Sequence, residues 1–368
     1  MNAIIMVTST KGPSSIGSHF TLPPMQCSFP VKLNPDYERV REECGPWILD
    51  LVHPKLQQFL SDCLLPRYVC RLFPEASDLP RLMTVTKFIA WLTLADDVVD
   101  TAVPCAELCD LTGSHDGGPQ STVTTWAHSV LLELHEPRDR EAHVACSRGL
   151  DLRRVILLDA LGELWKEMSC EITPQARVRF ITAMKDHLQA VCLHSTKDPT
   201  FVYHDRAGMS SSVKRYMGIR RLSSGFVLGL ELILYELGMD DDPIHLHELV
   251  HELRDLAIDY MCMCNDMVSV HMETLAGDYF NLPSVVYESG VAPSFQDALG
   301  IVAEMIRQVD ARCLQVVDTI CENEELMGRE PKLEVYLSTV MSCMSGALHW
   351  SFETKRYGLK LEDADVSG

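Results

Sequence analysis

Three carboxylates fall within five positions of an otherwise apolar stretch of the chain. In "LADDVVD", residues 94–100, these are Asp96, Asp97 and Asp100. An α-helix turns by about 100° per residue, so Asp97 and Asp100 project at about 100° and 40° from Asp96, and Asp96 shares a face with Asp100. The preceding run, "KFIAWLTLA", is apolar on every side, which predicts that the acids end a buried helix. Unpaired buried carboxylates are costly, and Mg²⁺ is a cation that carboxylate oxygens bind well.

A second set of oxygen donors follows another apolar run, "LAIDYMCMC". In "NDMVSVHME" the residues Asn265, Ser269 and Glu273 recur at i, i+4 and i+8. An amide, a hydroxyl and a carboxylate therefore lie along one stripe of a helix and are suited to another Mg²⁺. Two buried helices that each end in oxygen ligands favour one shared metal site over two patches of surface charge.

Helical phase also selects residues that would line a cavity between these two helices. On the first helix, the positions within about 60° of Asp96 face inward, Phe88 lies at the margin, and Trp91 points away into the core. On the second, the same argument starts from Asn265. The predicted pocket residues are Phe88, Ile89, Leu92, Thr93, Ile258, Met261 and Cys262.

The elements that position these residues are helices. From Pro35 onward apolar residues recur at three- and four-residue intervals, and no convincing strand alternation is present. The fold class is therefore predicted to be all-α: a single-domain helical bundle over residues 31–360 with a central apolar cavity. Residues 1–30, rich in Ser, Thr, Gly and Pro, are predicted to be a mobile N-terminal tail, and residues 361–368 a C-terminal tail. Helices are expected at about 35–49, 54–71, 77–102, 122–135, 149–171, 174–193, 209–237, 244–276, 281–288, 294–322 and 331–358.

Composition excludes several classes of protein. With 32 Lys and Arg against 52 Asp and Glu, the formal charge of −20 argues against a nucleic-acid partner. No stretch reaches the roughly 18 apolar residues that a membrane span needs. The 14 scattered cysteines and the absence of a signal-peptide pattern favour free thiols and a cytoplasmic location.

Two further groups of metal-binding residue types are weaker candidates. Cys105, Cys109 and His115 could suggest zinc, but a second ligand pair at the usual spacing is missing. In "HLHELVH", residues 245–251, His245 and His247 do not share a helix face, so solvated histidines are the better interpretation.

Taken together, the sequence motifs resemble a known family. "DDVVD" and "NDMVSVHME", which fits N-D-x-x-S-x-x-x-E, resemble the aspartate-rich and NSE motifs of class I terpene synthases of the microbial type. "YMGIRRLSSG", residues 216–225, resembles the stretch that carries the family's pyrophosphate-sensing arginine, and "HWSFETKRYG" resembles its C-terminal Arg-Tyr pair. The four motifs occur in the expected order, and the resemblance covers about residues 30–360.

The resemblance implies a helical bundle in which three Mg²⁺ ions hold an isoprenyl diphosphate and trigger its ionisation. Arg221 is preferred over Arg220 as the sensor, because it lies 44 residues before Asn265, close to the family's spacing. Trp350 lies seven residues before Tyr357, so on one helix it would share that face and could lie over the cavity. The implied metal ligands are Asp96, Asp97, Asp100, Asn265, Ser269 and Glu273. The implied diphosphate contacts are Arg220, Arg221, Arg356 and Tyr357, and the catalytic set is Asp96, Arg221, Asn265, Ser269, Glu273, Arg356 and Tyr357.

One departure from the family pattern is Met272, at a position where the family often has lysine before the motif's glutamate. A diphosphate contact is then missing or supplied elsewhere.

The expected reaction is cyclisation of farnesyl diphosphate to a sesquiterpene by a monomer or homodimer; geranyl and geranylgeranyl diphosphate are alternative substrates. The nearest rival is an isoprenyl diphosphate synthase, but such enzymes usually carry two aspartate-rich motifs and the second motif here is Asn-Ser-Glu. The DxDD pattern of proton-initiated cyclases is not present. A non-catalytic helical scaffold, with the acids as surface charge, is the alternative from another class.

Overall fold

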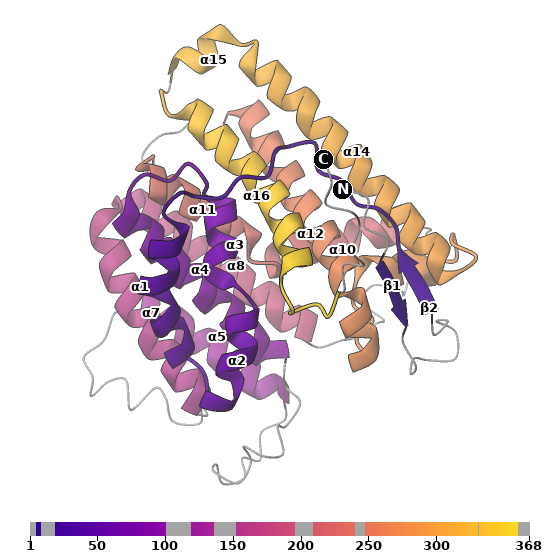
Figure 1. Ribbon diagram of the computed structural model, residues 1–368, viewed down its shortest axis with the longest axis horizontal. Coiled ribbons are helices and arrows are strands. Elements are labelled where there is room, and N and C mark those ends of the chain that lie inside the picture. Colours follow the sequence, from indigo (N-terminus) through magenta and orange to yellow (C-terminus); the bar gives the residue numbers. More distant parts are fainter. Residues whose placement is uncertain are drawn as a thin grey trace.

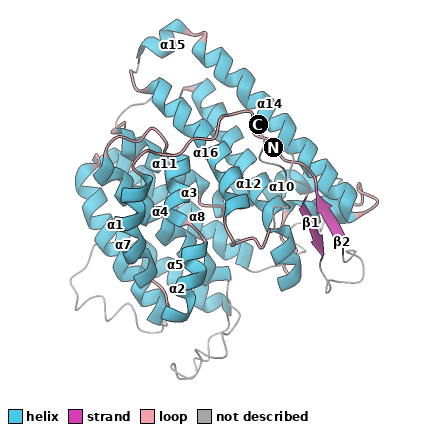
Figure 2. Cartoon of the chain, in the orientation of Figure 1, coloured by secondary structure: helices cyan, strands magenta, loops and turns pink. Residues whose placement is uncertain are grey.

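The computed structural model of the chain is built almost entirely of helices (Figures 1 and 2). It describes residues 5–8, 19–100, 119–135, 152–195, 209–239, 247–329 and 331–359; the side chains of residues 5–8, 19, 97–100, 119–125, 194, 195, 209 and 329 are outside this description. The predicted all-α class is confirmed. Within the described residues, no helix is long and apolar enough to cross a membrane.

Six helices form a closed ring. Each packs against the next in the order α3, α4, α8, α10, α12 and α16, and α16 packs back against α3. Side chains from all six line one central cavity. The ring helices are α3 (Leu65–Leu72), α4 (Leu79–Asp100), α8 (Pro174–Ser195), α10 (Met209–Ser223), α12 (Glu248–Ala276) and α16 (Leu333–Glu353).

A seventh helix, α11 (Phe226–Leu237), contacts α4, α8, α12 and α16 at once, so it lies across the ring. Its sequence "FVLGLELILYEL" is apolar on nearly every side, as a helix that packs among several others must be. The remaining helices pack outside the ring or connect its members (Figure 1). They are α1 (Tyr37–Asp50), α2 (Pro54–Asp62), α5 (Pro119–His135), α7 (Leu152–Glu171), α13 (Leu282–Glu288), α14 (Phe295–Cys321) and α15 (Glu324–Arg329).

The N-terminal segment differs from the tail that its composition predicts. Strands β1 (Ile5–Thr8) and β2 (His19–Leu22) pair as an antiparallel hairpin. From residue 20 onward the chain lies against the bundle: Phe20 and Phe29 are buried, the Tyr260 hydroxyl donates to the Gln26 carbonyl at 2.8 Å, and Ser28 donates to Asp310. The prediction of a mobile tail is therefore wrong for residues 20–30, because scattered aromatic residues supply enough apolar contact to fix an otherwise polar segment.

Three expected helices end or break earlier than their apolar period indicates. The span 54–71 is divided between α2 and α3, since Leu64 has a φ of 55° and Pro66 cannot donate to the carbonyl of residue 62. The span 209–237 is divided at Gly225, whose φ is 74°. The span 331–358 ends at Glu353, so the residues beyond it are not helical.

Candidate active site

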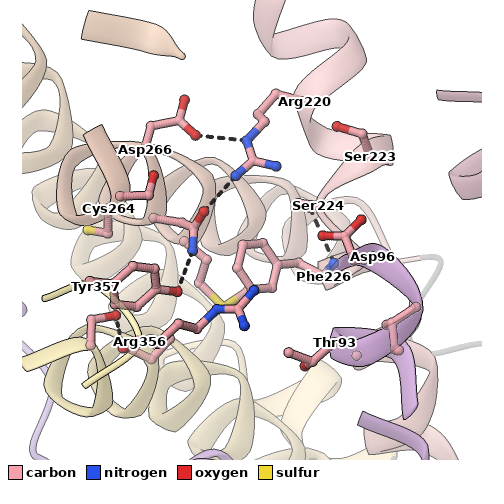
Figure 3. A pocket seen from close by; sticks show the side chains of 18 of the residues that line it. Thr93, Asp96, Arg220, Ser223, Ser224, Phe226, Cys264, Asp266, Arg356 and Tyr357 are labelled. Carbon is pink, nitrogen blue, oxygen red and sulfur yellow. Dashed lines mark hydrogen bonds and ion pairs between the residues drawn. The ribbon is translucent and has the colours of Figure 1, made fainter. Parts of the chain in front are cut away.

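The ring encloses a cavity of about 460 Å³. One wall is apolar, with Leu92, Met344 and Leu348 among its residues, and the other carries oxygen and nitrogen groups from α4, α10, α12 and the segment after α16. A cavity of this size is in the range that holds small organic ligands. Figure 3 shows Asp96 on α4 across the cavity from Asp266 on α12 and from Arg356 and Tyr357.

The three oxygen donors of the second motif all line this cavity from α12. Asn265 is half-buried and Ser269 is buried. The Ser269 Oγ makes no hydrogen bond of standard geometry, although it lies close enough to Glu273 to help lower that carboxyl's pKa. The helical spacing therefore does place the amide, the hydroxyl and the carboxylate on one stripe that faces the cavity.

Glu273 is the carboxyl group among the three donors, and its surroundings shift its pKa. Burial, together with the nearby charge of Asp266, raises the pKa of Glu273 to about 8. The Asn281 side chain donates to Glu273 at 2.8 Å, while its oxygen accepts from the Ser284 backbone N–H as the N-cap of α13. A carboxylate held here is costly without a cation, which is the condition that a metal ion satisfies.

The first motif reaches the same cavity through Asp96, which is half-buried in its lining. The side chains of Asp97 and Asp100 lie outside the described residues. Asp96 and the Asn265, Ser269 and Glu273 set therefore line one chamber from different helices, as a shared site requires.

Arg220 connects the polar wall of the cavity. Its Nε donates to Asp266 Oδ1 at 2.8 Å and its Nη2 donates to Asn265 Oδ1 at 2.7 Å. Burial opposes the charge on the guanidinium, but the Asp266 carboxylate outweighs it and raises the pKa of Arg220. Asp266 is itself buried and also accepts from the Tyr216 hydroxyl at 2.6 Å and from the Leu282 backbone. This network fixes one face of Arg220.

Arg221 points elsewhere, so the preference for Arg221 as the cavity arginine is wrong in placement. Its guanidinium pairs with Asp259 outside the lining, and its side chain is 43% exposed against 11% for Arg220. Neighbouring residues on a helix project about 100° apart, so only one of the pair can face inward. Motif spacing alone does not decide which.

Arg356 and Tyr357 lie in the cavity, in a turn of the segment after α16 (Figure 3). The break before α3 helps to hold this segment. Because Pro66 has no N–H, the Asp62 carbonyl accepts instead from the Lys355 backbone at 3.2 Å, and the Cys63 carbonyl accepts from the Trp350 Nε1 at 2.8 Å. The Tyr357 hydroxyl then accepts from the Asn265 side chain at 3.0 Å.

Most of the predicted pocket residues do line the cavity. Five of the eight candidates line the cavity: Ile89, Leu92, Thr93, Met261 and Trp350. Trp350 was expected there because it would share a helix face with Tyr357, but α16 ends at Glu353, before Tyr357. Its ring stacks on Tyr68 with centroids 4.3 Å apart and meets the Tyr357 ring edge-on.

Three pocket candidates lie outside the cavity. Phe88 is fully buried between the rings of Trp91 and Phe180. The Cys262 thiol faces the backbone of α10, 3.7 Å from the Arg220 carbonyl. Ile258 is buried two turns before Asn265, beyond the lining. Helical phase predicts the direction in which a side chain points, but it does not predict whether a neighbouring helix packs against that side chain and separates it from the cavity.

Several lining residues are not among the predicted site residues. Phe226 and Phe280 add aromatic surface, and Met272, 43% exposed, lies at the edge of the cavity, where it supplies no charge. His187 lines the wall from α8. Asp266 and Tyr216 stand inside two of the motifs and could have been found there as polar neighbours of Asn265 and Arg220. His187 lies in no motif, and one histidine in a helix has no spacing to interpret.

The donor chemistry fits a hard divalent cation. Amide, hydroxyl and carboxylate oxygens gather in the cavity, and these are the ligands that hard divalent cations prefer; Cys264, whose pKa is raised by burial, also lines it. Among the described residues, no three His, Cys, Asp or Glu side chains already form a metal-binding cluster. The zinc candidate, Cys105, Cys109 and His115, lies outside the described residues, as does His245.

Comparison with known proteins agrees with this geometry. Residues 87–309 match the model of terpene synthase family 2, C-terminal metal binding. The bifunctional terpene synthase Agr4 of Cyclocybe aegerita is 30% identical, over 94% of this chain and 90% of its own. Microbial terpene synthase-like protein 13 of Selaginella moellendorffii is 24% identical over 92% and 87% of the two chains.

Solved structures support the fold. An α-eudesmol synthase superposes with a TM-score of 0.69 at 16% identity, covering 89% of this chain and 98% of its own. Hedycaryol synthase, solved in complex with nerolidol, gives a TM-score of 0.65 at 19% identity, covering 90% of this chain and all of its own. Because the family model covers residues 87–309, more than half of the chain, the chain belongs to terpene synthase family 2 and is a microbial-type class I terpene synthase.

Proposed function

We propose that the protein is a Mg²⁺-dependent sesquiterpene synthase that ionises farnesyl diphosphate, cyclises the allylic cation and releases diphosphate. The observation that carries this proposal is the convergence of Asp96 with Asn265, Ser269 and Glu273 on one cavity that is also lined by apolar side chains, Leu92, Met344 and Leu348 among them. A polar end binds the charged group of such a substrate, and an apolar end holds its hydrocarbon chain.

The metal-binding role falls to oxygens of α4 and α12. Asp96, with Asp97 and Asp100 beside it in the sequence, would hold ions from one side; Asn265, Ser269 and Glu273 would hold an ion from the other. Three ions are proposed from the family resemblance. Bound Mg²⁺ would neutralise the charge that develops on the diphosphate as its bond to carbon breaks.

The chain's own cations complete the diphosphate site. Arg220 presents a guanidinium fixed on one edge by Asp266, and Arg356 lines the cavity from the segment after α16. Guanidinium groups bind phosphate oxygens through paired hydrogen bonds, which orient the leaving group as well as stabilise it. Tyr357 adds a hydroxyl next to Asn265. Arg220 therefore takes the sensor role that spacing assigned to Arg221.

The apolar wall would protect the cation after ionisation. Leu92, Met344 and Leu348 offer no nucleophile, and the Trp350, Tyr68 and Phe226 rings bring π faces and edges to the cavity. Aromatic faces attract positive charge, and a wall without water lets the cation rearrange before it is captured. The contour of this wall would select the product.

The substrate length rests on the relatives. Agr1 of Cyclocybe aegerita, 25% identical over 90% of this chain, is named a sesquiterpene synthase, and hedycaryol synthase was solved with the fifteen-carbon alcohol nerolidol. Farnesyl diphosphate is the fifteen-carbon diphosphate that leads to such products.

The test is direct. Purified protein is incubated with geranyl, farnesyl or geranylgeranyl diphosphate, with and without Mg²⁺, and both diphosphate release and the organic extract are analysed. We expect Mg²⁺-dependent release and a C15 hydrocarbon or alcohol from farnesyl diphosphate. Glu273→Gln should lower the rate about a hundredfold or more, whereas Glu248→Gln, an exposed position on the same helix, should not. Longer isoprenyl diphosphates in place of terpenes, or no reaction with any substrate, would refute the proposal.

A further inference from the structure

A buried histidine that no motif contains lies in the cavity wall. His187, on α8, is 5% exposed and lines the cavity together with Leu92, Val191 and Gly225. It lies on the opposite side of the ring from the segment that carries Arg356, since α8 packs between α4 and α10. The metal ligands and diphosphate contacts described above do not include it.

One hydrogen bond fixes the tautomer of His187. Its Nδ1 lies 3.0 Å from the Leu222 carbonyl oxygen, near the end of α10. A carbonyl oxygen can only accept, so Nδ1 carries the proton and the other ring nitrogen, Nε2, keeps a lone pair. Among the described residues, the Leu222 carbonyl is the hydrogen-bond partner that the structure gives this ring.

The imidazole lies beside the break between α10 and α11. Its Cε1 is 3.8 Å from the place that a β-carbon on Gly225 would occupy, and Gly225 is itself in the lining. Leu92 and Val191 are its other neighbours in the wall. The ring therefore belongs to the cavity lining, with apolar side chains of α4 and α8 as well as the polar Asp96, Ser223 and Ser224.

The charge state suits a proton acceptor. Burial, together with the positive charge of Arg220, lowers the pKa of His187 to about 4, so the ring is neutral at pH 7. When an anion binds Arg220, that guanidinium no longer opposes charge on the imidazole. The ring would thus become a better base once diphosphate has left the substrate but is still held by Arg220.

We propose that His187 Nε2 is the catalytic base that ends the cyclisation. A C–H bond next to the cationic carbon breaks, its electron pair forms the carbon–carbon double bond of the product, and the proton passes to Nε2. The resulting imidazolium returns the proton to released diphosphate or to water when the product leaves. This assignment rests on the proposed function.

Two variants separate a base from a structural histidine. His187→Asn retains an amide N–H near the Nδ1 position, so the bond to Leu222 can persist, but it has no basic nitrogen. His187→Gln places a polar, non-basic group near the position of Nε2. His251→Asn, at an exposed histidine on α12, is the control. Each protein is incubated with farnesyl diphosphate and Mg²⁺, and diphosphate release, the product profile and the thermal midpoint are measured.

If Nε2 is the base, both His187 variants release diphosphate at close to the normal rate, because ionisation does not use this residue. The share of the main olefin falls about tenfold or more, and isomers with a displaced double bond or alcohols from water capture replace it. The control keeps the original profile. The thermal midpoint of His187→Asn stays close to that of the unaltered protein.

Three results would overturn the assignment: an unchanged product profile in His187→Gln, a fall in diphosphate release with the product ratios preserved, or an unaltered protein whose products are only alcohols. A protein that releases no diphosphate at all would instead refute the proposed function. The two failures are therefore distinguishable, because one is measured in total turnover and the other in the distribution of products.

Discussion

Replacement of Glu353, the last residue of α16, tests how the C-terminal segment is held in the site. The carboxylate of Glu353 accepts from Arg71 at 2.8 and 2.6 Å and from Arg67 at 3.2 and 3.1 Å, so two guanidinium groups of α3 grip it. The side chain of Glu353 is 20% exposed and that of Arg71 is 8% exposed. Arg356 follows three residues later, which ties the position of this arginine to the ion pair.

The expected loss of stability follows from these contacts. A hydrogen bond to a charged group contributes roughly 1.5–3 kcal/mol, and breaking a fully buried pair costs roughly 3–5 kcal/mol. Since this cluster is only partly buried, we expect Glu353→Ala to lower the free energy of unfolding by about 2–4 kcal/mol, and Glu353→Gln, which retains one accepting oxygen, by about 1–2 kcal/mol.

The pH dependence gives an independent check. Burial alone would raise the pKa of Glu353, but hydrogen bonds from His349, Arg71 and Arg67 outweigh it and hold the pKa well below its usual range. A carboxyl whose folded-state pKa is depressed stabilises the protein above its unfolded-state pKa, about 4.3, and loses that contribution as the pH falls further. The stability gap between the unaltered protein and Glu353→Gln should therefore be full at pH 7 and narrow below about pH 4.3.

Urea unfolding at pH 7 and pH 4 measures this gap, and the Michaelis constant for the diphosphate substrate reports on Arg356. We expect the Michaelis constant to rise in both variants. Glu304→Ala, which removes an exposed ion pair with Arg307 on α14, is the control and should leave both quantities unchanged. A Glu353→Ala protein that unfolds within about 0.5 kcal/mol of the original at pH 7 would refute the reasoning, because the cluster would then behave as an ordinary surface pair.

Three other outcomes follow from single positions. Arg220→Met should slow diphosphate release about a hundredfold, while Arg221→Met should stay within about threefold, in the same steady-state assay. Burial and the charge of Asp78 raise the pKa of Glu236 to about 7, so ionisation of this carboxyl disfavours the folded state. The free energy of unfolding should therefore fall as the pH rises from about 4.3 to 7. Glu236→Gln should remove this fall, as measured by urea unfolding at pH 5 and pH 8. Gly225→Ala should cost about 1–3 kcal/mol and lower the thermal midpoint, because φ is 74° and the new methyl group would lie 2.9 Å from Leu92.

The parts of the site that the sequence predicts best lie on long unbroken helices. Ile89, Leu92 and Thr93 line the cavity because α4 keeps a constant turn per residue up to Asp96, and Met261 does so for the same reason on α12. Helical periodicity therefore predicts the cavity-lining residues only within one unbroken helix and only along the part of that helix that borders the cavity.

The parts that the sequence predicts poorly depend on breaks and on neighbours. Gly225 divides an apolar run that reads as one helix, and Pro66 divides another, so the tertiary arrangement around each break is invisible to a periodicity argument. Arg220 and Arg221 differ by one position, and the partners that separate them, Asp266 and Asp259, become apparent only once α10 packs against α12. The orientation of His187 depends on its hydrogen bond to the Leu222 carbonyl, 35 residues away in the sequence.

The central link between these elements is the Asn265 amide. Its oxygen accepts from Arg220 and its nitrogen donates to Tyr357, so one side chain joins α10, α12 and the segment after α16. A metal ion at that oxygen would repel the guanidinium that now occupies it, and a diphosphate would draw the same guanidinium away. Each ligand therefore removes an interaction that opposes the other, and the coupling between them is reciprocal by thermodynamic linkage. In the proposed reaction, this coupling would favour ionisation of the substrate only when the metal ion and the diphosphate group are both bound.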